Sequence, residues 1–93
     1  MASARVYLDT EARRLMLVVY DLPPLPPGRS YQLWVIRGGE PESAGVFGIG
    51  SGGSARYTPA SVPSLEGAVT IAVTIEPEGG LPKPSGPMVL AGS

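Results

Sequence analysis

The sequence contains no cysteine and no histidine among its 93 residues. Disulfide bonds, thiolate catalysis and cysteine metal sites are therefore excluded, because each of them needs a thiol. The absence of histidine removes the commonest general base, the usual pH switch near neutrality and the commonest metal ligand. Hydroxyl groups, carboxylates, arginines and one lysine are the groups left for chemistry.

Charge and hydropathy argue against two further classes of protein. The chain carries seven basic and eight acidic residues, a net charge of −1, and the basic residues form no cluster along the sequence. Binding a nucleic-acid backbone needs several lysines or arginines on one face, so we predict no nucleic-acid partner. The apolar runs are far shorter than the roughly 20 residues that cross a bilayer, and the beginning of the chain shows no secretory signal peptide.

Glycine and proline, in contrast, are abundant, with thirteen and eleven residues. Both residue types interrupt helices and favour turns, so we expect many turns and no long helix. A chain of 93 residues has room for one modest core. We therefore predict a single domain that spans residues 1–93 without an internal boundary.

The stretch 30–37 is the strongest strand signal and holds the only tryptophan. Aromatic and β-branched residues favour a pleated surface, and their alternation places apolar side chains on both faces. We predict a central strand that is covered on both faces, at least over Trp34 and Ile36. Gly38-Gly39 predicts a type I′ hairpin turn, after which residues 43–47 return antiparallel.

Other segments also show strand patterns. Residues 14–20 are apolar on both faces, which indicates an interior strand. Alternation in residues 68–75 directs Val69, Ile71, Val73 and Ile75 toward the core, and their neighbours outward or under a thin covering layer. Further short strands are predicted at 5–9, 54–59 and 87–92, and one helical turn at 60–67, anchored by Val62 and Leu65. About seven short strands with turns every 8–12 residues predict an all-β fold, an immunoglobulin-like antiparallel β-sandwich.

The proline-rich segment 21–29 separates two strong strands. Its PxxP spacing is also that of SH3 and WW ligands, but its place between strands favours a stiff connection. Tyr31 follows the Pro-Gly turn at its end. Such a tyrosine in fibronectin-type sandwiches donates its hydroxyl to upstream backbone, and we expect Tyr31 to make this tyrosine corner.

Residues 48–53 match the pattern G-x-G-x-x-G of dinucleotide-binding loops. That function requires a helix directly after the loop, with its N-terminus facing the pyrophosphate. A strand-like segment that stops at Pro59 follows instead. We therefore predict a mobile hairpin tip and no nucleotide site.

Three groups of side chains are candidates for catalysis or metal binding. Ser85 lies two residues from Lys83, but a lysine in a solvated turn stays charged and does not activate a nucleophile. The pair Glu40 and Glu42 flanks a hairpin turn, where charge protects a sheet edge. Glu76 ends the strongest strand, and we expect its carboxylate to accept amides of the following turn, from Gly79 and Gly80, rather than calcium. We predict no enzyme and no cofactor.

Three blocks of the sequence together resemble the C-terminal domain of anti-sigma-K factors (RskA-like). They are Pro-Gly-Arg-Ser-Tyr-Gln-Leu-Trp-Val-Ile at 27–36, Ser-Ala-Gly-Val-Phe at 43–47, and the Glu-Pro-x-Gly-Gly block within 73–87. The resemblance extends from about Ala4 to Gly92. The residues that carry it as a structural signature are Tyr31, Trp34, Gly45, Phe47, Glu76, Pro77, Gly79, Gly80 and Gly86.

The resemblance implies a regulatory role. In such proteins a cytoplasmic zinc-binding domain restrains an extracytoplasmic-function sigma factor, a membrane helix follows, and the domain matched here lies outside the membrane. Regulated proteolysis then releases the sigma factor. We therefore expect an envelope protease or sensor protein as partner, and contact with sigma factor and membrane only through missing parts. The alternative is a generic envelope adhesion or scaffold module. Met1-Ala2-Ser3 favours an excised fragment over a stand-alone protein.

Overall fold

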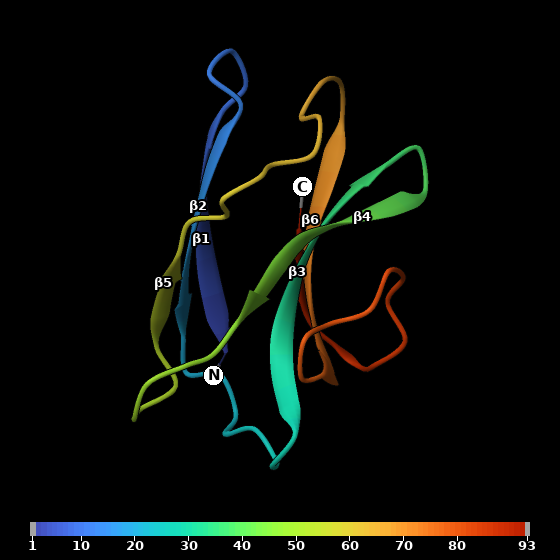
Figure 1. The fold of residues 1–93 in the computed structure, drawn as a ribbon. Helices are drawn as coiled ribbons and strands as arrows, with labels where there is room; N and C mark the ends of the chain where they lie inside the picture. Colours follow the sequence, from blue (N-terminus) through green and yellow to red (C-terminus); the bar gives the residue numbers. More distant parts are fainter. Residues whose placement is uncertain (1, 93) are drawn as a thin grey trace.

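The computed structural model describes residues 2–92 and consists of β-strands and connecting loops (Figure 1). No helix in this range could span a bilayer. The seven strands are β1 (Ser3–Asp9), β2 (Arg14–Tyr20), β3 (Arg29–Arg37), β4 (Glu40–Phe47), β5 (Ala55–Tyr57), β6 (Val69–Pro77) and β7 (Met88–Gly92).

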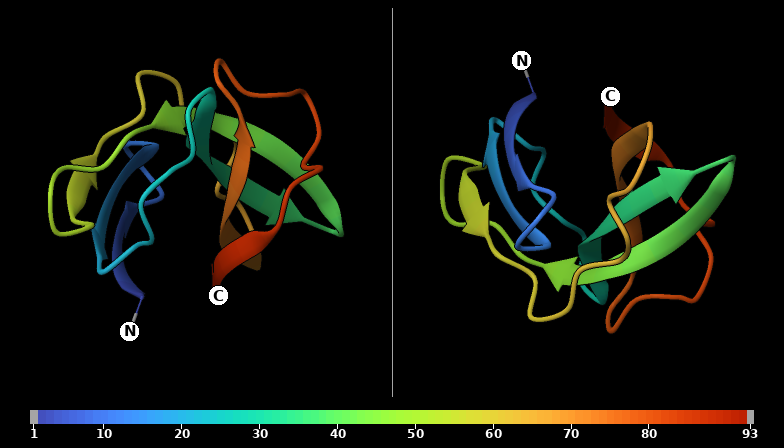
Figure 2. Two further views of the ribbon diagram at one scale, coloured as in Figure 1. Left: turned by 90° about the horizontal axis from the view of Figure 1, so that it is seen from below. Right: turned by 90° about the horizontal axis from the view of Figure 1, so that it is seen from above.

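The strands form two antiparallel sheets that face each other (Figure 2). One sheet has the order β1-β2-β5, and the other has the order β4-β3-β6-β7. Two packed antiparallel sheets of short strands are the architecture of immunoglobulin-like sandwiches. The predicted all-β sandwich is therefore confirmed, and both β2 and β3 are interior strands as expected.

The core lies between the two sheets. Alternate residues of β2 are almost fully buried, and they face Leu33, Val35 and Val73 of the other sheet. This arrangement follows from the period of two along each strand, since only one face of β2 can reach the opposite sheet. The twelve buried members of this cluster are Leu15, Leu17, Val19, Leu22, Tyr31, Leu33, Val35, Ala44, Phe47, Leu65, Ile71 and Val73.

The β3–β4 hairpin confirms its predicted turn, because Gly38 and Gly39 both have positive φ, at 57° and 79°. The register then shifts, so that Ala44 and Gly45 together lie opposite Leu33. This is a β-bulge, in which one extra residue bends the strand. The Tyr57 hydroxyl donates a 2.9 Å hydrogen bond to the carbonyl of Ala44, and thereby ties the bulge to β5 in the other sheet.

The tyrosine corner is present, since the Tyr31 hydroxyl donates a hydrogen bond to the carbonyl of Pro23. It ties the start of β3 to the proline-rich connection from β2. The Tyr31 ring is fully buried, and it stacks on Phe47 with a centroid separation of 5.8 Å. A rigid proline segment is thus fixed to the core at one carbonyl.

Two sequence-based expectations about connections are wrong. Residues 48–53 are not a hairpin tip, because β4 and β5 belong to different sheets and the segment 48–54 crosses between them. A hydrogen bond from the Leu22 amide to the Gly53 carbonyl, 2.9 Å long, pins this crossover. Residues 60–67 contain no helical turn. Pro63 is buried and keeps the preceding residue out of the helical region, although Val62 and Leu65 do pack on the core.

We predict that Tyr31→Phe lowers the free energy of unfolding by about 1–2 kcal/mol, because the Pro23 carbonyl loses its donor. Tyr20→Phe is the matched control, because Tyr20 is 40% exposed and its hydroxyl makes no hydrogen bond to another residue in the range 2–92. Urea denaturation of both variants measures the difference. Equal stability of the two variants would show that the corner bond contributes nothing.

Candidate functional site

The loop 78–87 folds back across the outer face of the four-stranded sheet (Figure 1). Under it lies Trp34, which is fully buried although it points away from the core between the sheets. The expected cover over both faces of β3 is therefore confirmed at Trp34, while Ile36 is only half-buried. The loop, rather than a second sheet, supplies this cover.

Glu76 holds the loop in place. Its carboxylate is fully buried and accepts hydrogen bonds from the amides of Ser85 and Gly86, at 3.1 and 3.2 Å, and from the Ser85 hydroxyl at 2.9 Å. Burial by itself raises the pKa of the Glu76 carboxyl, but hydrogen bonds from Thr74, Gly86 and Ser85 outweigh it and hold the pKa below its ordinary value. The ionised form is therefore the one that the fold stabilises.

The same carboxylate is connected to the tryptophan. The Trp34 indole donates to the Thr74 hydroxyl at 2.8 Å, and this hydroxyl donates to Glu76 at 2.6 Å. Thr74 and Glu76 are two positions apart on β6, so their side chains lie on the same face of the sheet. The residue of β3 that is opposite Thr74 in the strand register has its side chain on this face too. Within residues 2–92 no buried side-chain nitrogen or oxygen, including those under the loop, lacks a hydrogen-bond partner.

A second contact, from Gln32, clamps the other end of the loop. Its side-chain amide donates to the Leu81 carbonyl at 2.9 Å and to the Ser43 hydroxyl at 2.7 Å, and its carbonyl accepts from the Leu81 amide at 3.0 Å. Gln32 thus pairs with Leu81 as a neighbouring strand would. Together Glu76 and Gln32 attach both ends of the loop to the sheet.

Two glycines allow this close approach. A Cβ atom at Gly86 would lie 1.6 Å from the carbonyl oxygen of Ile75, so the loop can pass only where this residue has no side chain. A Cβ at Gly80 would meet Val46 at 2.8 Å and Gln32 at 2.9 Å, and its φ of 79° also favours glycine. Glycine is required at both positions because the loop packs directly against the sheet.

The signature residues divide into two clusters. Trp34, Glu76, Pro77, Gly79, Gly80 and Gly86 build the loop clamp or its turn, in which the Gly80 amide donates to the Pro77 carbonyl. Tyr31, Gly45 and Phe47 belong to the second cluster, where Phe47 stacks on both Tyr31 and Tyr57. A side chain at Gly45 would collide with the Tyr57 hydroxyl. The two clusters are different sites on the sheet.

The clamp matches the expected capping role of Glu76, but with different donors. The expected donors are the amides of Gly79 and Gly80, whereas the amides of Ser85 and Gly86 are the observed ones. Gly79 and Gly80 do have positive φ, at 90° and 79°. The donors were missed because they lie nine and ten residues beyond Glu76, and only the path of the loop brings them back. The Thr-x-Glu spacing on one strand face was the available signal for Thr74.

The geometry assembles no catalytic pair from the candidates. The Ser85 hydroxyl donates to Glu76, while the exposed Lys83 ammonium lies 3.5 Å from the Glu40 carboxylate. Glu76 is buried and Glu78 is exposed, so they do not act as a carboxylate pair. Within residues 2–92 no three acidic, histidine or cysteine side chains are placed to hold a metal ion.

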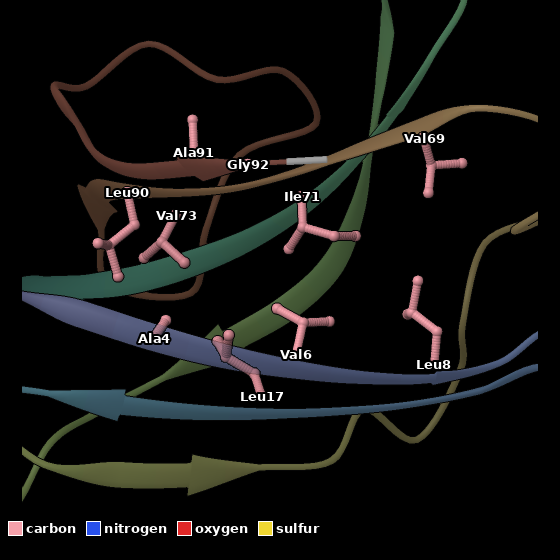
Figure 3. Close-up of a pocket in the computed structure, with 10 residues that line it drawn as sticks. All are labelled: Ala4, Val6, Leu8, Leu17, Val69, Ile71, Val73, Leu90, Ala91 and Gly92. Atoms are coloured by element: carbon pink, nitrogen blue, oxygen red, sulfur yellow. The ribbon is translucent and has the colours of Figure 1, made fainter.

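The structure also has an apolar slit of about 420 Å³ between the facing edges of the two sheets (Figure 3). Val6 and Leu8 of β1 point into it from one sheet, and Ile71 and Leu90 do so from the other. All its lining side chains are aliphatic or absent, so it offers no polar side chain that would orient a substrate. The slit is the open side of the core.

The site and fold define a β-sandwich whose best-formed polar cluster holds its own loop. The family described as anti-sigma-K factor rskA, C-terminal, matches residues 1–88, and the chain belongs to this family. The family is one of regulatory rather than enzymatic proteins. No solved structure matches the chain significantly.

Individual relatives agree with this assignment. Anti-sigma-K factor RskA of Mycobacterium ulcerans is 33% identical over 84 residues, which are 90% of this chain and 35% of that protein. The protein of the same name from Mycolicibacterium vanbaalenii is 33% identical over 86 residues, 92% of the chain and 35% of the relative. The protein of the same name from Mycobacterium tuberculosis is 32% identical over 88 residues, which are 90% of this chain and 36% of that protein. The chain thus spans about a third of the length of these curated relatives.

We predict that Glu76→Gln lowers the free energy of unfolding by about 1–3 kcal/mol at pH 7, because an amide cannot accept every hydrogen bond that the carboxylate accepts. The folded state lowers the pKa of Glu76, so its ionised form adds stability above the ordinary value of 4.5, and this stability is lost as the pH falls below that value. The gap between wild type and variant therefore narrows in acid.

Denaturation curves from pH 7 to pH 3 test this pH dependence. Glu78→Gln is the matched control, because Glu78 is exposed and two residues away. A gap that stays constant with pH would contradict the role of the ionised carboxylate.

We predict that Gly86→Ala destabilises the fold by about 2–4 kcal/mol, since the new methyl group must displace either the loop or the Ile75 carbonyl. Gly48→Ala is the control, because its φ is not positive and its Cβ would have no atom within 4 Å. Thermal unfolding followed by tryptophan fluorescence reports on both, as Trp34 lies beneath the loop. A Gly86→Ala protein as stable as Gly48→Ala would refute the packing argument.

Proposed function

We propose that the chain is the extracytoplasmic regulatory domain of a membrane-anchored anti-sigma factor that controls an extracytoplasmic-function sigma factor. The observation that carries the proposal is the family match over residues 1–88, combined with coverage of only about a third of each named relative. Sigma-factor binding and membrane anchoring then belong to the other two thirds. An envelope protease or a sensor protein is the partner of the part described here.

The proposed mechanism is steric protection. A protease binds its substrate as an extended chain, and the chain cannot enter the protease in this conformation while the sandwich is folded. Fold stability, typically about 5–15 kcal/mol for domains, then sets how often the chain is open to cleavage without a signal. A partner that binds only the folded form adds protection by mass action.

The loop clamp supports this mechanism because it couples much of the fold to a few contacts. Glu76, Gln32 and Trp34 join β3, β6 and the loop 78–87 in one hydrogen-bonded unit. Removing Glu76 or Gln32 leaves polar groups of the loop without partners, which is costly. A regulator that works through opening of its fold needs such a cooperative unit.

The test uses the full-length parent protein in cells that carry a reporter for the cognate sigma factor. Trp34→Ala and Ile71→Ala, each at matched expression, are expected to raise reporter activity, because loss of a large buried side chain costs about 3–5 kcal/mol for Trp34 and about 2–5 kcal/mol for Ile71. Gly48→Ala is the control that leaves the core intact.

Immunoblots of the membrane fraction accompany the reporter. Steric protection predicts less intact protein for the two core variants than for the control. A silent reporter together with intact core variants at the membrane would reject the mechanism, and would favour an adhesion or scaffold module instead.

A further inference from the structure

The outer face of the three-stranded sheet brings together basic and amphipathic side chains that are scattered in the sequence. Inward-facing residues of β2 are buried, so Met16, Val18 and Tyr20 point outward. The strand register places Arg5 of β1 and Arg56 of β5 directly on either side of Val18. Residues opposite each other in a sheet share a face, so these side chains form one row.

The rows on either side extend this surface, which we call the outer arginine face. Tyr7 pairs with Met16 on one side, and beyond them Asp9 pairs with Arg14. The face is made of Arg5, Tyr7, Asp9, Arg14, Met16, Val18, Tyr20 and Arg56. It therefore has three of the seven basic residues of the chain and one of the eight acidic ones. Glu11 and Asp21 lie in the turns at its two ends.

This charge is available to a partner. Arg5 and Arg56 are exposed, and neither forms an ion pair with any residue of the described range 2–92. Tyr7 is 50% and Tyr20 40% exposed, and Val18 is only half-buried in the middle of an interior strand. The three-stranded sheet forms one outside layer of the sandwich (Figure 2). The sequence offered no basic cluster, but the fold builds one.

We propose that the outer arginine face binds the headgroup region of a bilayer that contains anionic phospholipid. Arginine guanidinium groups bind phosphate oxygens in a bidentate manner and tolerate partial desolvation. Tyrosine rings with exposed hydroxyls suit the boundary between headgroups and acyl chains. Arg5 and Arg56 lie two strand spacings apart, about 10 Å, so each can reach a different headgroup.

Other occupants fit the face less well. A second copy would set arginines against arginines across a two-fold axis, which is unfavourable. A small anion would need a concave site, and the apolar slit between the sheets is lined by none of the residues of this face. An acidic protein needs donors and acceptors that fix its orientation, whereas this face offers donors around the apolar side chains of Val18 and Met16 and only one carboxylate, Asp9. A planar anionic surface requires nothing more than this arrangement.

The proposal is independent of the regulatory role, because the 93-residue chain is tested alone. If its parent is anchored in a membrane, the tether keeps the face near lipid and a weak affinity is sufficient. Each arginine near an anionic surface strengthens binding by about fivefold, so reversal of two charges is expected to weaken it by at least about 25-fold.

The experiment is co-sedimentation with vesicles of phosphatidylglycerol and phosphatidylcholine, against vesicles of phosphatidylcholine alone, at 50 mM salt. The test variant is Arg5→Glu/Arg56→Glu. Its charge-matched control is Arg29→Glu/Arg37→Glu, which makes the same change of net charge on β3 of the other sheet. Circular dichroism and thermal unfolding establish that all three proteins are folded.

The expected result is binding to the anionic vesicles only, weakened by 500 mM salt, lost in the test variant and retained in the control. Absence of binding by the folded wild type would overturn the proposal and leave an acidic protein as the occupant to seek. Equal loss in both variants would also overturn it, since binding would then follow net charge rather than this face. Equal binding to neutral vesicles would exclude the role of the arginines.

Discussion

The buried carboxylate of Glu76 is the constraint on which the outer half of the structure depends. A buried charge is tolerated only with a full set of hydrogen-bond partners. The donors are the amides of Ser85 and Gly86 and the hydroxyls of Ser85 and Thr74, so the loop cannot leave without exposing the charge. Because the loop stays, Trp34 is buried on a sheet face that would otherwise be open to water. One ionised group thus helps a chain of only 93 residues to cover the outer face of the four-stranded sheet over Trp34.

Rules that act over a few residues recovered most of the fold from the sequence. Alternation located the strands, Gly38-Gly39 gave the turn, and the Pro-Gly turn before Tyr31 indicated the corner bond. Features that depend on distant contacts were missed. The crossover at 48–54 follows from which sheet β5 joins, and the donors to Glu76 follow from the path of a ten-residue loop. The outer arginine face could not be predicted from the sequence either, because only the strand register brings Arg5 and Arg56 together.

In this member of the anti-sigma-K factor family, the two signature clusters have the same structural role. Neither the loop clamp nor the stack of Tyr31, Phe47 and Tyr57 is built to carry out a reaction. Each instead ties strands that are distant in sequence, and Gly45 and Gly86 are required where side chains would collide. Both clusters therefore hold the fold together rather than carry out chemistry.

The position of β1 at a sheet edge makes the molecule mechanically uneven. β1 pairs with one neighbour only, and six of its seven residues are exposed, whereas β6 is paired on both sides and anchored through Glu76. A force that peels β1 away from β2 at one end breaks its register pairs one after another. Removal of β6 must instead break its pairs with both β3 and β7, as well as the hydrogen bonds of Glu76. Fewer contacts therefore hold β1 than hold β6.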